Sequence, residues 1–153
     1  MGGTVFFETV GDALASFLPP RLRGFRSHRT SRNLKVWYDD ETREHYEVQF
    51  VSDHALRAAK LKLRAPVLEI GFHTEHAQAD RNDGVLTALA EKTWRKALGP
   101  QAQAGSFVGH PTPWRRISEL WDGDGLDSGE TATEAAARLS AYICALEPLR
   151  RPR

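Results

Sequence analysis

Residues 34–51 decide the fold, and they read LKVWYDDETREHYEVQFV. Two runs rich in aromatic and β-branched side chains, 34–38 and 45–51, flank a polar segment at 39–42 that suits a turn. The pattern therefore predicts a β-hairpin. Because successive side chains of a strand point to opposite faces of the sheet, the same pattern assigns each hairpin residue to a core face or an outer face.

Helices and further strands are predicted on both sides of this hairpin. Apolar residues recur at helical spacing over 4–18, where two prolines end the first helix. A short helix within 52–64, a strand over 66–73, a helix over 83–98, a second hairpin made of 106–108 and 114–121, and a last helix follow. A capping box of the Thr-x-x-Glu type places the start of that last helix at Thr131.

These elements predict a single α+β domain over residues 1–153. We expect an antiparallel sheet of about five strands with three main helices, in the order α-β-β-β-α-β-β-α. Residues 148–153 form a basic tail that we expect to be disordered. The element order resembles that of type III secretion chaperone-like folds, and this resemblance implies a binding protein.

One face of the predicted sheet is polar. The residues expected to face the core are Val36, Tyr38, Tyr46, Val48, Phe50, Leu68, Ile70 and Phe72. The residues expected on the opposite face are Lys35, Trp37, His45, Glu47, Gln49, Glu69 and His73. If this face forms a pocket, Glu47 or Glu69 is the candidate catalytic base and His73 its partner. The favoured alternative is a solvated sheet face, which antiparallel sheets commonly have.

The run from His73 to His76 contains metal-capable side chains. Zinc requires three or four converging ligands. On an extended strand His73 and Glu75 share a face while His76 points away, so we expect no metal site and no cofactor. The acidic segment 122–130 also fails the calcium-loop template, because position 5 of the loop is Leu126.

Charge is segregated along a chain whose net charge is only +1. Residues 21–35 carry six cations and no acid, whereas residues 119–134 carry six acids and no base. The candidate binding residues of the basic stretch are Arg21, Arg23, Arg26, Arg29, Arg32, Lys35 and Trp37. This stretch could bind a protein partner, a second copy of the chain or, less readily, nucleic acid, because the chain as a whole is not basic.

The remaining features limit the function classes without selecting one. A single cysteine, Cys144, fits a cytoplasmic location, and no apolar run approaches the length of about 18 residues needed to span a membrane. The nucleotide and hydrolase motifs that are recognisable by sequence are absent. We therefore expect a cytoplasmic protein-binding or adaptor-like module without catalysis. The alternatives are a hydrolase or metal-dependent enzyme that uses the polar sheet face, and a nucleic-acid-binding protein.

Overall fold

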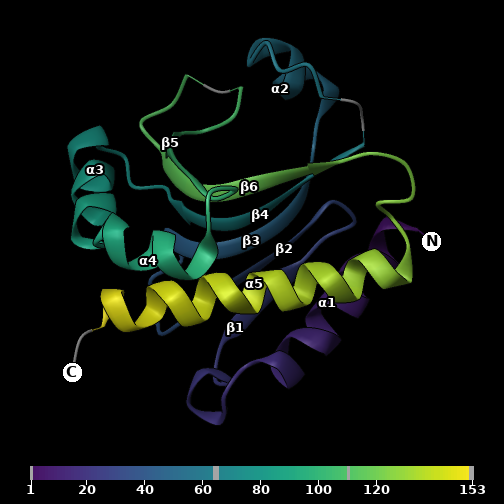
Figure 1. The fold of residues 1–153 in the computed structure, drawn as a ribbon, viewed down its shortest axis with the longest axis horizontal. Helices are drawn as coiled ribbons and strands as arrows, with labels where there is room; N and C mark the ends of the chain where they lie inside the picture. The colour runs from purple at the N-terminus through teal and green to yellow at the C-terminus, as the bar shows by residue number, and fades with distance from the viewer. Residues whose placement is uncertain (1, 64–65, 110, 152–153) are drawn as a thin grey trace.

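A six-stranded antiparallel sheet forms the centre of the molecule (Figure 1). The structure is a computed structural model that describes residues 2–63, 66–109 and 111–151. In spatial order the strands are β1 (Arg26–Arg29), β2 (Asn33–Trp37), β3 (Glu44–Val51), β4 (Val67–Thr74), β6 (Arg115–Asp122) and β5 (Gln103–Ser106). The predicted α+β class and the predicted hairpin of β2 and β3 are confirmed.

Helices cover the two faces of this sheet unequally. The long helices α1 (Gly3–Phe17) and α5 (Gly129–Arg150) pack together against one face, and the short helix α2 (Asp53–Ala58) lies on the other side (Figure 1). The helices α3 (Ala79–Ala88) and α4 (Glu91–Leu98) lie at one end of the sheet, and the 3-10 turn η1 (Pro20–Leu22) follows α1. None of the described helices is long and apolar enough to cross a membrane.

The hydrophobic core lies between the sheet and the α1–α5 pair. The strand residues predicted to face the core do so, and Val36, Tyr46 and Ile70 are fully buried. The apolar stripe of α5, with Leu139 and Ile143, completes this core. The opposite face of the sheet is therefore free to carry polar side chains.

The helix predicted over 83–98 is in fact two helices with a break at Leu89 and Ala90. Asn82 is of a residue type that favours helix N-caps, but it lies within α3 rather than at its start. Its side chain bonds Thr74 Oγ1, the backbone of His76 and the carbonyl of Pro113. Tertiary hydrogen bonds thus override the local capping signal.

The ends of two other elements also differ from the prediction. The second hairpin begins earlier, at Gln103, and α5 begins at Gly129 because Ser128 Oγ, not Thr131, accepts the capping hydrogen bond. Residues 148–150 of the expected tail form the last turn of α5, and residues 152–153 lie outside the described residues.

Candidate metal centre

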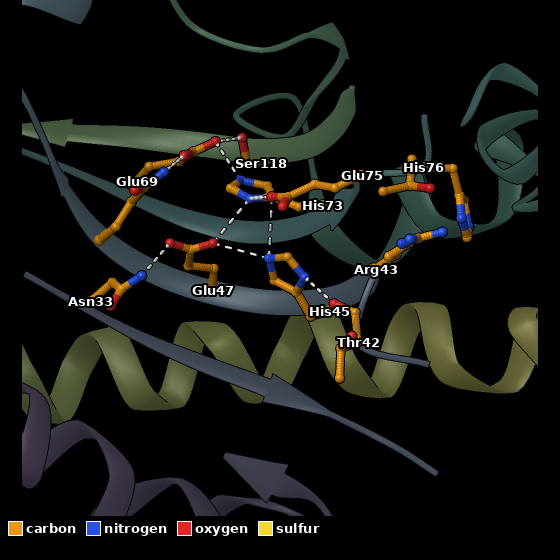
Figure 2. Close-up of polar contacts among 12 residues, drawn as sticks. Asn33, Thr42, Arg43, His45, Glu47, Glu69, His73, Glu75, His76 and Ser118 are labelled. Atoms are coloured by element: carbon orange, nitrogen blue, oxygen red, sulfur yellow. Dashed lines mark hydrogen bonds and ion pairs between the residues drawn. The ribbon is translucent and has the colours of Figure 1, made fainter. Parts of the chain in front are cut away.

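Two His-x-Glu segments on neighbouring strands build a polar cluster on the sheet face opposite the core (Figure 2). His45 lies directly opposite His73 in the pairing of β3 with β4. Strand alternation puts Glu47 on the same face as His45. The backbone N–H of Glu75 bonds the carbonyl of Arg43 at 2.7 Å, which continues the strand pairing just past the end of β4.

Four side-chain atoms of this cluster surround one small space. His45 Nε2 lies 3.0 Å from Glu47 Oε1 and 3.4 Å from Glu75 Oε2. His73 Nδ1 lies 3.1 Å and 3.4 Å from the same two oxygens. His45 and His73 are each 1% exposed and Glu47 is 3% exposed, whereas the Glu75 side chain is 16% exposed. These residues can each offer one ligand atom, all within 4.8 Å of one another, to a metal ion.

Both histidines are oriented by hydrogen bonds from the ring nitrogen on their far side. His45 Nδ1 lies 2.9 Å from the carbonyl oxygen of Thr42, which can only accept, so this nitrogen carries a hydrogen. His73 Nε2 in the same way donates to Glu69 Oε2 at 3.1 Å. The remaining nitrogens, His45 Nε2 and His73 Nδ1, face the two carboxylates and must hold either a proton or a cation.

The hydrogen bonding of these two nitrogens differs. His45 Nε2 has hydrogen-bond geometry toward Glu47. His73 Nδ1 is fully buried and makes no hydrogen bond within the described structure, although two carboxylate oxygens are close. A buried nitrogen without a hydrogen bond is uncommon in proteins, and ligation of an ion is one arrangement that would satisfy it.

Electrostatics favour positive charge at this point. Burial raises the pKa of the Glu47 carboxyl, but contacts with His45 and His73 outweigh it and hold that pKa well below its usual range. Burial lowers the pKa of His73, but Glu69, Glu47 and Glu75 together raise it well above its ordinary value. The surroundings of His73 therefore favour a positive charge at this point of the cluster.

Glu69 forms a second layer behind His73. Its Oε1 accepts from the Gln49 amide at 2.6 Å, and its Oε2 accepts from Ser118 Oγ at 2.6 Å as well as from His73. Burial raises the pKa of Glu69, but His73, Ser118 and Gln49 outweigh it and lower the pKa to about 2. Arg116 donates to Ser118 Oγ at 2.8 Å and extends the chain of hydrogen bonds.

Gly71 allows this second layer to form. It lies opposite Glu47 on one side and Ser118 on the other, with a φ of +156°. A Cβ at this position would lie 2.3 Å from the Ile117 carbonyl oxygen and 2.5 Å from Ser118 Cα. Only glycine therefore permits β6 to approach β4 closely enough for Ser118 to reach Glu69.

The cluster lies at the floor of a pocket of 580 Å³. The pocket has a volume typical of small-molecule sites. Its walls come from the polar strand face, from the start of α2 and from the loop between β5 and β6. Its lining residues include Arg32, Lys35, Glu47, His73, Glu75, Phe107 and Trp114. The favoured interpretation of this face as a solvated surface is wrong, because residues 107–108, 112 and 114 and the start of α2 line a pocket over it, and its central side chains are buried.

The structure brings the three predicted catalytic residues, Glu47, Glu69 and His73, into one cluster. It adds His45 and Glu75, which the sequence-based candidate set lacks. The repeated His-x-Glu spacing at 45–47 and 73–75 is the signal that would have found them. His76 points away, as predicted, and binds Glu44 at 2.7 Å.

The candidate binding residues of the basic stretch do not gather on one surface. Arg23 donates to the carbonyls of Ala15 and Leu18 at the end of α1, and Arg26 pairs with Asp40. Arg29 is exposed on β1, Trp37 is half-buried at the end of β2, and Arg21 borders a different pocket. Only Arg32 and Lys35 line the pocket above the His-Glu cluster.

A second metal-capable group consists of Glu41, Glu44 and His76. Its central carboxylate, Glu44, already accepts from Arg150 at 3.0 Å as well as from His76. Burial raises the pKa of Glu44, but these two partners outweigh it and lower that pKa. A guanidinium thus already supplies the positive charge here, so the first cluster is the better metal centre.

In comparisons with protein families, curated proteins and solved structures, nothing matches this chain. The function must therefore be argued from the site itself.

Proposed function

We propose that this protein is a metal-dependent enzyme of the hydrolytic class, with His45, Glu47 and His73 as the metal ligands. The observation that carries the proposal is the orientation of the two imidazoles. Each ring uses its far nitrogen as a hydrogen-bond donor and turns the other nitrogen toward the same pair of carboxylate oxygens. An acceptor that binds the far ring nitrogen and so fixes the tautomer is a recurrent feature of histidines that bind metals.

The spacing of the proposed ligand atoms supports a small divalent cation. Tetrahedral zinc with bonds of about 2.0–2.1 Å places neighbouring ligand atoms about 3.3–3.4 Å apart. His45 Nε2 and His73 Nδ1 lie 3.0 and 3.1 Å from Glu47 Oε1. Two imidazoles and a carboxylate with one open position are a ligand set that zinc uses in catalytic sites.

Glu75 has a different part in this proposal. It is the most exposed of the four side chains and lines the pocket, so it lies between the metal ligands and an incoming substrate. A water molecule in the open position would lose its proton to Glu75, and its oxygen would attack the electrophilic centre of the substrate. The same carboxyl group would then return the proton to the leaving group.

Metal binding tests the proposal directly. Purified protein, stripped with a chelator and titrated with Zn²⁺, is expected to bind one equivalent, and His73→Ala is expected to abolish this binding. The cobalt-substituted protein should show the visible spectrum of four-coordinate nitrogen and oxygen ligation, which is a readout independent of activity. Parallel titrations with Mn²⁺ and Fe²⁺ identify the preferred ion.

His54→Ala is the matched control, because His54 is exposed on α2 and outside the cluster. Glu75→Gln should keep metal binding and lose hydrolysis in a screen of generic esters and phosphoesters. Wild-type protein that binds none of these ions at one equivalent, or an His54 variant that loses as much affinity as the His73 variant, would reject the metal centre.

We also propose a second candidate function, the binding of a protein through β1. This strand is at the edge of the sheet, and all four of its residues, Arg26 to Arg29, are exposed. The basic side chains of this edge would attract an acidic surface. The turn before α5 and the first residues of α5 in a second copy, where Asp124, Asp127 and Glu130 are exposed, are complementary in charge.

Light scattering after size exclusion, at low and high salt, tests this second function. A dimer that dissociates in high salt and is lost in Arg29→Glu would support it. A monomer at low salt for both proteins would exclude self-association through β1.

A further inference from the structure

Two cations that line the pocket have no side-chain ion pair among the described residues. Arg32 lies in the turn between β1 and β2, and Lys35 lies on β2 directly opposite Glu47. Both line the pocket, and within the described residues neither side chain has an ion pair. The turn that carries Arg32 is fixed by a hydrogen bond from the Phe50 N–H to the Arg32 carbonyl at 3.1 Å.

Lys35 is not required to neutralise Glu47. Glu47 Oε1 faces the two histidines, and its Oε2 accepts from the Asn33 amide at 3.0 Å. Both oxygens of this carboxylate are therefore occupied, and the Lys35 ammonium remains available to a ligand. An unpaired cation at the wall of a pocket favours an anion in that pocket.

The loop between β5 and β6 contributes an aromatic wall to the same pocket. The Phe107 ring lies 4.5 Å from the His73 ring and 5.4 Å from the Trp114 ring, measured between ring centroids. The pocket therefore combines the proposed metal centre with two positive side chains and an apolar wall. Such a combination suits a small organic molecule with one strongly anionic group.

We infer that the substrate is a phosphate monoester of a small organic molecule. The inference rests on the proposed function. The two charges of Arg32 and Lys35 match the charge of up to −2 that a phosphate monoester carries near neutral pH. The guanidinium of Arg32 can hold two phosphate oxygens while the Lys35 ammonium binds as a point charge. The organic group would lie against Phe107 and Trp114.

The reaction that follows balances with water alone. The oxygen of the activated water forms a new bond to phosphorus, and the ester P–O bond breaks. Glu75 takes the proton from this water and passes it to the departing alkoxide, so the products are an alcohol and inorganic phosphate. Arg32 and Lys35 would stabilise the charge that develops on the phosphate oxygens.

The test uses inorganic phosphate as the probe. Zinc-loaded, desalted protein is titrated with phosphate by calorimetry, and metal-free protein is titrated in parallel. Arg32→Gln and Lys35→Gln are each expected to weaken phosphate binding roughly 10- to 100-fold, as for the loss of a charge-assisted hydrogen bond, with zinc binding unchanged. Arg29→Gln is the matched control, because Arg29 belongs to the same basic stretch but is not among the lining residues.

A second arm compares substrates. Hydrolysis of p-nitrophenyl phosphate should exceed that of p-nitrophenyl acetate and should fall in the Arg32 and Lys35 variants. Zinc-loaded protein that binds phosphate no better than the two variants do, or that prefers benzoate to phosphate, would overturn the phosphate inference and leave the metal centre standing. Failure to bind zinc would overturn the metal centre. In that case the phosphate site would be judged from the metal-free protein, by whether its phosphate affinity falls in the Arg32 and Lys35 variants.

Discussion

Glu69 accepts a hydrogen bond from His73, and this contact suits a positioning role better than direct action on a substrate. All its hydrogen bonds run to the protein itself, from Gln49, Ser118 and His73, and its side chain is buried. A carboxylate that is fully occupied in this way is poorly placed to take a proton from water. Its negative charge instead fixes the orientation of the His73 ring and increases the basicity of Nδ1.

Replacing Glu69 by glutamine should therefore lower metal affinity without unfolding the protein. We expect Glu69→Gln to weaken zinc binding about 10- to 100-fold, which is typical for the loss of an outer-shell partner. The thermal unfolding of the metal-free variant should stay close to that of the metal-free wild type, because Gln49 can reverse its amide to suit the new side chain. Calorimetric titration with Zn²⁺ measures the first quantity and circular dichroism the second.

Glu91→Gln is the control, since Glu91 is exposed on α4. An unchanged zinc affinity in Glu69→Gln would show that Glu69 does not position His73.

The sequence predicted that Glu47, Glu69 and His73 share a sheet face, because that follows from the two-residue period of a strand. It did not predict the part that Glu69 has, because this depends on Ser118 and on the close approach that Gly71 allows.

At the scale of elements, the end of α5 is held against the start of β3 by one buried guanidinium. Arg150 is 9% exposed in its side chain and binds Glu44 of β3 at 3.0 Å, together with Glu147 one turn earlier in α5. Tyr46 of β3 also donates to Glu147 at 2.9 Å. Glu44 immediately precedes His45, so this contact also braces the strand that carries the cluster.

Arg150→Ala should be strongly destabilising, because it would remove the buried cation that Glu147, which is buried, shares with the half-buried Glu44. Removal of one partner from a buried ion pair costs about 3–5 kcal/mol. Arg26→Ala is the comparison: its side chain is 65% exposed and pairs with Asp40, which is 91% exposed. A surface pair of this kind contributes about 0–1 kcal/mol. Urea unfolding of both variants measures the difference, and equal losses would contradict the role given to Arg150.

This element also shows where local sequence signals stop being informative. The apolar stripe of α5 was predictable from its helical spacing, and so was its general position. The first residue of α5 was not predictable, because Ser128 and Thr131 are both good capping residues. The conformation of the turn before the helix determines that Ser128 is the cap. The break between α3 and α4 was hidden for a similar reason, since Asn82 is used for contacts with β4 and β6 that sequence spacing does not reveal.

On the scale of the whole molecule, carboxylates are buried on both faces of the sheet, but their positively charged partners differ. On the core side, Glu119 accepts from Arg138, Tyr142 and Trp121, and Glu147 accepts from Arg150 and Tyr46. Each of these carboxylates has an arginine. On the pocket side, Glu47 and Glu75 face two histidines and have no arginine among the contacts described. This difference in partners is what we expect between an internal ion pair and the proposed metal centre, whose cation would come from solution.

A protein that takes up a cation at such a site should be more stable with it. A ligand present at about 100 times its Kd, and bound only by the folded state, adds about 2.7 kcal/mol to the free energy of unfolding. For a chain of this size we therefore expect zinc to raise Tm by about 5–10 °C. Differential scanning calorimetry of chelator-treated protein, with and without Zn²⁺, measures this shift.

The rise in Tm should depend on the cluster and not on histidines in general. His54→Ala should retain it in full, because His54 is exposed and outside the pocket. His73→Ala should lose the rise in Tm. Glu75→Gln should keep most of the rise, because His45, Glu47 and His73, the three proposed ligands, are unchanged. If zinc raised the Tm of the His73 variant as much as that of the wild type, the cation would bind elsewhere on the chain. The buried His-Glu cluster would then be a self-contained network of imidazolium and carboxylate groups that stabilises the sheet face.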